Sequence, residues 1–520
     1  MAGRVVVRCC ERSLVVRFAY RTHGVGECAR VPSMSSFVDR PVVPMWIGGR
    51  EALASDGATL EVINPATGRR ITTVPSATAA DVESAFQAAN AAFPAWSRSH
   101  PLERARLLRQ LADIVDAHGD ELAALDVMDN GSPIKEMRKD VDIASAQLRY
   151  FAGLVLQVRG ETIPTGEGRL DYTLRQPYGV VARIVPFNHP LMFAAGKIAA
   201  PLAAGNTVIL KPSEHTSLSA LRLAELAKDV LPAGVLNVIT GLGQSAGDAL
   251  VAHPGIRRLA FIGAETTGRA IVARSMGVNV KHVSLELGGK NPLLVFDDAN
   301  LDLAVDGAIR GMNFTWQGQS CGSTSRVFVQ RGSYEAFIDT LVASVGALKQ
   351  GQPDDWTTET GSMINRQQFD KVQYYLNLGQ QEGSRLVLGG EHLTRDGLGD
   401  GLFISPAVFR DVDPNSRMAR EEIFGPVMAV MPFDGYDDGL ALANDTELGL
   451  TAAVYTKDLS IAHRFAHEVQ AGFVWVNDSS RHFIGAPFGG YKDSGLGREE
   501  DIEELESYTQ VKNVNVWYAQ

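Results

Sequence analysis

Cysteine is scarce in this chain of 520 residues, which contains only four. Cys9, Cys10 and Cys28 lie near the N-terminus, so Cys321 is the single cysteine from residue 29 to the end. A lone thiol can form neither an internal disulfide nor a multi-cysteine metal site in that part of the chain. The scarcity is typical of a reducing compartment, and we expect a cytoplasmic protein.

Long apolar runs and excess positive charge are also missing. The most apolar stretch, residues 190–210, contains Lys197, Pro201 and Asn206, which a membrane-spanning helix would avoid. The 49 basic residues are outnumbered by 60 acidic ones, giving a net charge of −11. Because nucleic-acid-binding proteins usually present a basic surface, we expect neither a nucleic-acid partner nor a membrane span. No cluster of histidine and cysteine indicates a metal, and we predict none.

Residues 1–36 differ from the rest in having six arginines and only two glutamates. Such a basic, acid-poor composition resembles an organelle transit peptide. The alternative is an extension that is disordered or misassigned, with the true start at Met34 or Met45. We favour this second interpretation, and the folded protein is expected to begin near Met45.

The length predicts two or three domains of an α/β protein. Apolar residues recur at helical spacing over 79–93, 101–129 and 134–155. From Gly179 onward, short apolar runs alternate with helical patterns, which predicts a parallel sheet covered on both faces. The expected strands are 180–185, 207–210, 235–239 and 258–262. A second α/β series is expected from Asn291 to Lys492, and a tail strand over 506–518 that pairs with another element or subunit.

The segment around Cys321 is built of small and polar residues. A structural cysteine usually lies among bulky aliphatic side chains, whereas Gly318 and Gly322 would allow the close backbone approach that a nucleophile needs. From this segment alone, a catalytic thiol and an inert core thiol are equally good interpretations.

Two segments after predicted strands suit a nucleotide. Gly263 opens a turn before a helix expected near Thr266, and a helix start can hold a phosphate. The pattern is G-x4-G, and such turns also occur without a ligand. Lys211 and Glu214 follow a buried strand and could hold the hydroxyls of a ribose, or could form an ordinary solvated turn.

Two further residues suit acyl chemistry. Glu286 lies in an apolar run before Gly288 and Gly289, where burial would raise its pKa and make it a usable general base. An ion pair with Lys290 is the alternative. Asn188 follows a strand between two prolines and could donate its amide to an oxyanion, or satisfy its own backbone in a turn.

Four of these segments together resemble the aldehyde dehydrogenase superfamily over residues 45–520. They are Glu-Leu-Gly-Gly-Lys at 286–290, Gln-Ser-Cys with its cysteine 35 positions after Glu286, Glu-Glu-Ile-Phe-Gly-Pro at 421–426, and Pro-Phe-Gly-Gly-Tyr-Lys at 487–492. The resemblance implies a Rossmann-like NAD-binding domain (45–158 and 178–288), an α/β catalytic domain (289–498) and a small β oligomerisation element (159–177 and 499–520). It also implies a homodimer or homotetramer.

The resemblance assigns a role to each matching residue. Cys321 is the nucleophile, Asn188 and the backbone N–H of Cys321 form the oxyanion hole, Glu286 is the general base, and Lys197 and Glu499 are linked to proton transfer. NAD is the expected cofactor, with NADP as the alternative, because Glu214 would repel a 2′-phosphate. The implied cofactor residues are Pro186, Phe187, Lys211, Glu214, Gly243, Gly263, Ala264, Glu422 and Phe424. The implied substrate pocket contains Phe187, Trp316, His482, Phe483 and Phe488.

The implied reaction is the oxidation of an aldehyde to a carboxylic acid through a thiohemiacetal and a thioester on Cys321. The aromatic pocket suggests an aromatic or medium-sized aldehyde, although Arg481 and His482 would suit a carboxylated one. Phe187 and Ala264 depart from the tryptophan and serine of many members. The alternatives are a CoA-acylating or semialdehyde dehydrogenase, and a non-catalytic binding protein on the same scaffold.

Overall fold

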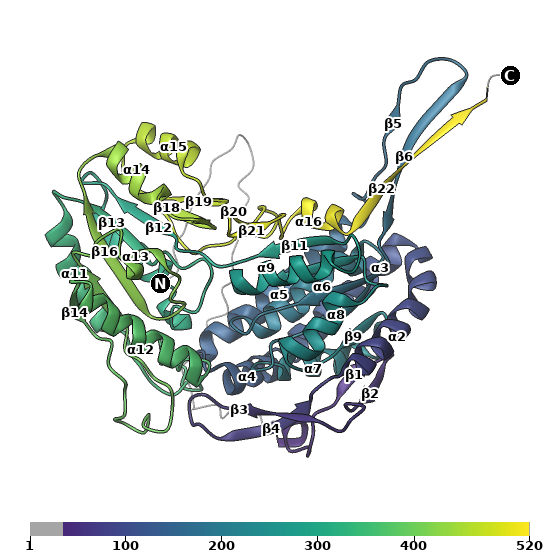
Figure 1. The fold of residues 1–520 in the computed structure, drawn as a ribbon, viewed down its shortest axis with the longest axis horizontal. Helices are drawn as coiled ribbons and strands as arrows, with labels where there is room; N and C mark the ends of the chain where they lie inside the picture. Colours follow the sequence, from purple (N-terminus) through teal and green to yellow (C-terminus); the bar gives the residue numbers. More distant parts are fainter. Residues whose placement is uncertain (1–34, 519–520) are drawn as a thin grey trace, which may run out of the picture.

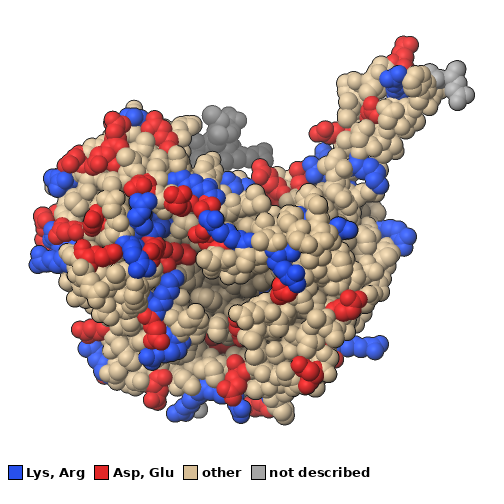
Figure 2. Space-filling model, viewed as in Figure 1, with Lys and Arg blue, Asp and Glu red and all other residues tan. Residues whose placement is uncertain are grey.

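The computed structural model describes residues 35–518, so the basic segment 1–34 lies outside the described residues. Two α/β lobes lie side by side, and a narrow arm of β-strands projects from one of them (Figure 1). The surface is hollowed between the two lobes, with acidic and basic side chains mixed around the hollow (Figure 2).

Within the described range, eight strands form the first sheet, in the order β2-β1-β9-β8-β7-β10-β11-β21. The five neighbours from β9 to β11 run parallel, which confirms the predicted parallel sheet, and the outer strands are antiparallel. The strands are β1 (Met45–Ile47), β2 (Arg50–Ala52), β7 (Val180–Ile184), β8 (Thr207–Lys211), β9 (Leu236–Val238), β10 (Arg258–Ile262), β11 (His282–Glu286) and β21 (Gly495–Leu496).

Alternate side chains of these strands enter two different cores. Val180 and Ala182 of β7 pack with one helical layer, while Val181 packs with the other. The first layer consists of α2 (Ala79–Arg98), η1 (Gly243–Gly247), α8 (Asp248–Ala252) and α9 (Glu265–Met276). The second consists of α3 (Pro101–Ala117), α4 (Gly119–Asn130), α5 (Ile134–Leu154), α6 (Pro190–Ala203) and α7 (Leu218–Ala227). Burial of both faces explains why the strands are continuous apolar runs.

A second sheet of seven strands, counted over residues 35–518, forms the other lobe in the order β14-β15-β16-β13-β12-β18-β19. Its strands are β12 (Pro292–Val295), β13 (Arg326–Gln330), β14 (Arg385–Leu388), β15 (Ala407–Arg410), β16 (Val427–Phe433), β18 (Thr451–Tyr455) and β19 (Phe473–Val476). The helices of this lobe are α10 (Leu301–Gly311), η2 (Phe314–Trp316), α11 (Tyr334–Gly346), α12 (Arg366–Gln381), α13 (Arg417–Arg420), α14 (Tyr436–Asn444) and α15 (Leu459–Glu468).

The arm is a three-stranded antiparallel sheet in the order β22-β6-β5. It joins β5 (Thr162–Ile163) and β6 (Arg169–Pro177) to the tail strand β22 (Thr509–Trp517), so residues far apart in the sequence pair along the whole length of β6. Short elements complete the fold: α1 (Ser35–Val38), β3 (Thr59–Ile63), β4 (Arg70–Pro75), β17 (Leu448–Gly449), β20 (Tyr491–Lys492) and α16 (Ile502–Ser507).

Three of the predicted helix and strand boundaries differ from the structure by more than one residue. α2 continues through Pro94 to Arg98, because Trp96 is buried and anchors the added turn. The helical stretch 101–129 is divided at His118, which caps both α3 and α4. The tail strand begins at Thr509, since residues 502–507 form α16 and Asp501 caps its first N–H groups.

Candidate active site

The carboxyl ends of four parallel strands bring the predicted functional segments to one edge of the first sheet. β7, β8, β10 and β11 end at Ile184, Lys211, Ile262 and Glu286, and the register pairs Ile184 with Lys211 and Ile262 with Glu286. The strand order reverses between β7 and β10, because the chain moves outward from β7 to β9 and resumes at β10 on the other side. Ligands of open α/β sheets bind at such a switch point.

A cavity of about 1060 Å³ lies at this switch point. It is lined by the turns after β7, β8 and β10, by α8 and α9, and by Asn365, Gln367 and Gln368 at the start of α12 in the second lobe. No sequence pattern marked these three polar residues. Seven of the predicted cofactor residues line the cavity: Pro186, Phe187, Lys211, Glu214, Gly243, Gly263 and Ala264.

The turn at Gly263 is shaped for an anion. A Cβ atom at this position would lie 2.5 Å from the ring of Phe261, so only glycine fits without displacing that ring. α9 begins at Glu265, one residue earlier than predicted, and Ala264 caps it without a side-chain hydrogen bond. Thr266 and Thr267 of the first turn line the cavity. The start of a 12-residue helix therefore borders the cavity, where its N–H groups and dipole favour a phosphate.

Lys211 and Glu214 form a pair on the wall of the same cavity. Their charged groups lie 3.8 Å apart, and Nζ of Lys211 also donates to the carbonyl of Pro212. Burial lowers the pKa of Lys211, and the half-buried Glu214 opposes this effect. The pair presents one donor and one acceptor, which suits the hydroxyl groups of a ribose.

Glu422 and Phe424 do not line this cavity, although Phe424 contacts Phe187, which does. A carboxylate oxygen of Glu422 accepts the N–H of Gly289 at 2.8 Å, and burial raises the pKa of this carboxyl group. The ring of Phe424 meets that of Phe187 edge to face, with centroids 5.7 Å apart. Gln368 donates to the carbonyls of residues 423 and 424, which fixes this segment against α12.

Cys321 lies on a tight loop that follows η2. Asn313 and Gln317, the residues on either side of η2, both have positive φ. The side chain of Asn291 donates to the carbonyl of Cys321 at 2.8 Å, and Gly289 approaches so closely that its Cβ would lie 2.5 Å from that carbonyl oxygen. The thiol is half-buried, and the backbone N–H of Cys321 has no hydrogen-bond partner in the described part of the chain.

Asn188 lies on the turn after β7, which ends at Ile184, and is held by its neighbours rather than by its own side chain. Nδ2 of Asn130 donates to the carbonyl of Phe187 at 2.6 Å and so fixes the preceding residue. Asn188 is only 3% exposed, and its Oδ1 is buried without a hydrogen-bond partner among residues 35–518. The donor atom of this amide, Nδ2, makes no hydrogen bond within residues 35–518 either, so it is available to a ligand.

Glu286 and Cys321 interact directly. Burial raises the pKa of Glu286 to about 8, although its hydrogen bond with the Cys321 thiol acts in the opposite direction. Burial, followed by the charge of Glu286, raises the pKa of the thiol well above its usual range. The site therefore holds a thiol beside a carboxyl group that can gain or lose a proton near neutral pH.

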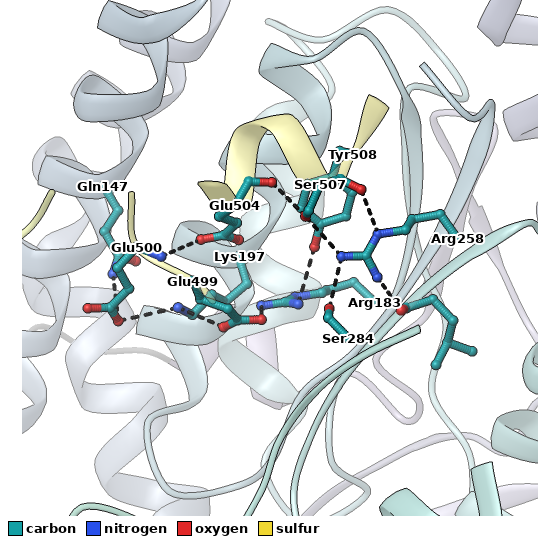
Figure 3. Close-up of polar contacts among 11 residues, drawn as sticks. Gln147, Arg183, Lys197, Arg258, Ser284, Glu499, Glu500, Glu504, Ser507 and Tyr508 are labelled. Carbon is teal, nitrogen blue, oxygen red and sulfur yellow. Dashed lines mark hydrogen bonds and ion pairs between the residues drawn. The ribbon is translucent and has the colours of Figure 1, made fainter. Parts of the chain in front are cut away.

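Lys197 and Glu499 lie in a buried charged network (Figure 3), and the charges of both shift the pKa of Glu286. Nζ of Lys197 lies 3.0 Å from Glu499 and 3.3 Å from Glu500. Burial alone would lower the pKa of Lys197, but these carboxylates raise it above its ordinary value. Arg183 of β7 contacts Glu499 from the other side at 2.6 Å. Sequence reasoning missed Arg183, because it lies within an apolar strand and belongs to no motif.

The predicted substrate residues are spread over two regions. Trp316 is half-buried and its ring lies 5.3 Å from that of His189. Phe488 is buried and its ring lies 4.7 Å from that of the exposed His482. Phe483 is 64% exposed. Phe187 borders the large cavity, so it connects the predicted substrate residues with the predicted cofactor residues.

No group of three or more histidine, cysteine, aspartate or glutamate side chains within residues 35–518 is arranged to hold a metal ion. No helix in that range is both long and apolar enough to cross a membrane.

Comparison with known proteins identifies close relatives of the whole folded region. The sequence profile of the aldehyde dehydrogenase family matches residues 53–514. Aldehyde dehydrogenase tropH of Talaromyces stipitatus is 44% identical over 463 residues, which cover 88% of this chain and 90% of the relative. A putative aldehyde dehydrogenase from Burkholderia cenocepacia has a solved structure with 44% identity and a TM-score of 0.90, covering 91% of this chain and 97% of that one.

A betaine aldehyde dehydrogenase from Staphylococcus aureus was solved in complex with NAD⁺. It is 36% identical to this chain and has a TM-score of 0.91, and the match covers 94% of this chain and 97% of that one.

Proposed function

The chain belongs to the aldehyde dehydrogenase family, and from this premise we propose that it oxidises an aldehyde to the free carboxylic acid with NAD⁺. The observation that carries the proposal is that the Cys321 thiol and the Glu286 carboxyl group are close enough to shift each other's pKa, while the Asn188 amide is buried and unused. Together they supply a nucleophile, a base and an oxyanion donor.

The residues around the large cavity fit a dinucleotide. The start of α9 suits the pyrophosphate, Lys211 and Glu214 suit the adenosine ribose, and Glu422 with Phe424 would hold the nicotinamide half. A solved relative binds NAD⁺, which supports the same cofactor here. The carboxylate of Glu214 disfavours a 2′-phosphate, so we propose NAD⁺ rather than NADP⁺. When bound, the nicotinamide ring supplies the acceptor for the hydride of the aldehyde.

Acylation begins with the addition of the Cys321 sulfur to the carbonyl carbon of the aldehyde. The thiol proton passes to the Glu286 carboxylate, since the two groups lie close enough to shift each other's pKa. The carbonyl oxygen becomes an alkoxide, which the Asn188 amide and the Cys321 backbone N–H stabilise. Departure of the hydride from the former aldehyde carbon leaves a thioester on Cys321.

Hydrolysis then frees the enzyme. Glu286 first releases to solvent the proton that it took from the thiol, and then accepts a proton from a water molecule while the water oxygen forms a bond with the thioester carbon. The carbon–sulfur bond breaks, the acyl group leaves as the carboxylic acid, and Cys321 regains its proton. The charges of Lys197 and Glu499 shift the ionisation of Glu286 in opposite directions.

The test is NADH formation in a panel of aldehydes with and without coenzyme A. We expect activity that is independent of coenzyme A, complete loss in Cys321→Ala, and recovery of the free acid as the product. Unchanged turnover in Cys321→Ala would contradict the proposal. A rate that requires coenzyme A would favour a CoA-acylating enzyme, and turnover of any aldehyde excludes a purely binding protein.

We propose an aromatic or medium-sized aldehyde as the substrate. Trp316 lies just before the loop of Cys321 and Phe187 borders the large cavity, which favours an aromatic substrate. Arg481 already faces Asp478 at 3.7 Å, which weakens it as a partner for a substrate carboxylate. In the same panel, aromatic aldehydes should give the highest kcat/KM. Higher values for short aliphatic or carboxylated aldehydes would contradict this assignment.

The proposal extends to assembly and location. The β5-β6-β22 arm carries exposed apolar side chains such as Leu170, Leu174 and Val511, which supports a homodimer or homotetramer built through the arm. The scarcity of cysteine supports a reducing compartment such as the cytoplasm. Light scattering and cell fractionation would test these two points.

A further inference from the structure

Arg183 is an arginine in the middle of a buried parallel sheet. All five residues of β7 are buried, and Arg183 is the largest wholly buried side chain among the described residues. It points to the same face as Val181, the face that α6 and Tyr508 cover. A buried charge destabilises a protein unless it is paired, so its partners identify what it is for.

Those partners connect the sheet to the proposed proton-transfer residues. Nη2 of Arg183 lies 2.6 Å from Oε1 of Glu499, and Nη1 donates to the hydroxyl of Tyr508 at 3.2 Å (Figure 3). The second oxygen of Glu499, Oε2, lies 3.0 Å from Nζ of Lys197. Glu499 is thus shared between two buried cations that approach it from different elements, β7 and α6.

Several other charged groups face this cluster. Glu500 accepts from Lys197 and lies 3.7 Å from His482, and Glu504 of α16 accepts the backbone N–H of Glu500. Arg258 of β10 stacks over the Tyr508 ring. Burial raises the pKa of Glu504 to about 7, while burial opposed by Lys197 and His482 leaves the pKa of Glu500 lowered to about 2.

Glu286 is sensitive to the charges of this cluster. After burial and its hydrogen bond with Cys321, the next influences on its pKa are Glu499, which raises it, and Lys197, which lowers it. Burial favours protonation of Glu499, but Arg183 and Lys197 together lower the pKa of this carboxyl group. The pKa of Glu286 therefore depends on the contacts that Arg183 and Lys197 make with Glu499.

We propose that Arg183 is a positioning residue: by holding one oxygen of Glu499, it keeps the other on Lys197 and fixes the charge that faces Glu286 during thioester hydrolysis. This inference rests on the proposed function. The competing explanation is that Arg183 only ties the segment 499–508 to the sheet. Arg258 provides such an anchor already, because it bonds to Ser507 and Ser284 without pairing with a carboxylate within the described residues.

The test compares the full-length variants Arg183→Gln and Arg258→Gln. Each removes one buried guanidinium beside Tyr508, so the two should lose similar thermal stability. Loss of the Arg183 charge leaves the cluster more negative, which disfavours the Glu286 carboxylate. We expect the acid limb of the kcat–pH profile to move upward by about one pH unit in Arg183→Gln, with roughly tenfold lower kcat at neutral pH. In Arg183→Gln, KM for the aldehyde should stay at its wild-type value. In Arg258→Gln, the acid limb of the kcat–pH profile should stay at its wild-type position.

A second pair of variants keeps the test valid if Arg183→Gln folds poorly. Glu499→Gln combined with Arg183→Gln removes both members of the buried pair, which avoids an unpaired interior charge. If Arg183 acts through Glu499, this double variant should have the same acid limb as Glu499→Gln alone. Arg183→Lys, which keeps the charge, should return the limb toward the wild-type position.

The outcomes distinguish a failure of the proposed function from a failure of the proposed role of Arg183. Absence of CoA-independent aldehyde oxidation in the wild-type enzyme would overturn the proposed function itself. Active wild type with equal pH profiles in Arg183→Gln and Arg258→Gln would overturn the role of Arg183 alone. The role of Arg183 would also be overturned if Arg183→Gln shifted the acid limb equally in the wild-type and in the Glu499→Gln background. Arg183 would then not act through Glu499.

Discussion

The carboxyl group of Glu286 lies close enough to the thiol of Cys321 for each group to shift the pKa of the other, and the charge of Glu286 is one cause of the raised pKa of that thiol. The protein without bound ligand therefore holds its nucleophile as a neutral thiol. Substitution of Glu286 should therefore make the thiol of the free enzyme more reactive and at the same time slow catalytic turnover.

Glu286→Gln should make Cys321 more reactive in the free enzyme. Removing the negative charge lowers the pKa of the thiol, so more thiolate is present near neutral pH. We expect faster alkylation by iodoacetamide, measured by mass spectrometry on the peptide that contains Cys321, with Cys321→Ala as the blank. Slower alkylation would show instead that Glu286 removes the thiol proton in the resting enzyme.

The same variant should nevertheless be a poor catalyst. Loss of a general base typically lowers the rate of its step by about 10² to 10⁴-fold. We expect a rapid first turnover of NADH followed by slow steady-state hydrolysis, observed by stopped-flow absorbance. A proportionate fall of both phases would indicate that Glu286 serves acylation as much as hydrolysis.

Asn188→Ala should lower kcat without weakening the binding of NAD⁺. The Asn188 amide is buried and its oxygen lacks a partner among the described residues, so the side chain is not needed to hold the fold together. Removing one oxyanion donor typically lowers kcat by about 10² to 10³-fold. Asn188→Asp keeps the size but places a carboxylate beside the oxyanion, and it should be at least as damaging. Activity close to wild type in either variant would remove Asn188 from the proposed mechanism.

Glu214→Gln should reduce the preference for NAD⁺ over NADP⁺. Glu214 lies 3.8 Å from Lys211 on the cavity wall, and its charge is the feature that would repel a 2′-phosphate. We expect the ratio of kcat/KM for the two cofactors to fall by about tenfold or more, equivalent to ~1.4 kcal/mol. Glu83→Gln, an exposed change of the same type on α2, controls for net charge. An unchanged ratio would mean that the ribose site is elsewhere.

The sequence was most informative where the chemistry follows a strand directly. Gly263, Lys211 and Asn188 could be identified because each comes just after an apolar run, and parallel strands end at a common edge. Glu286 was noticed because a carboxylate is unusual in such a run. The position of these residues relative to one another then depends mainly on sheet register, which is local and regular.

Residues that act through tertiary contacts could not be found in this way. Arg183 has the pattern of a strand residue, and its contact with Glu499 joins positions more than 300 residues apart. Gln368 approaches the cavity only because the second lobe packs against the first. The pairing of β6 with β22 has the same origin, since the sequence predicted a tail strand that pairs with another element or subunit but did not identify β6 as that element.

Asp126, a buried acid outside the catalytic site, should make the stability of the protein depend on pH. Asp126 of α4 is wholly buried and accepts the backbone N–H of Leu191 at 3.0 Å. Burial raises the pKa of Asp126 to about 7, far above the value of about 4 expected in the unfolded chain. The folded state therefore binds more protons than the unfolded state between these values, so its stability should fall as the pH rises from about 4 to about 7.

Asp126→Asn should remove this pH dependence, because the amide oxygen can still accept from Leu191 but no longer titrates. We expect the melting temperature of the wild type relative to the variant to be higher at pH ~5 than at pH ~8, corresponding to roughly 1 to 4 kcal/mol. Asp339→Asn, at an exposed position of α11, should show a constant difference over the same range. A constant difference for Asp126→Asn as well would mean that Asp126 is already ionised in the folded protein, and that its neighbours stabilise the charge despite its burial.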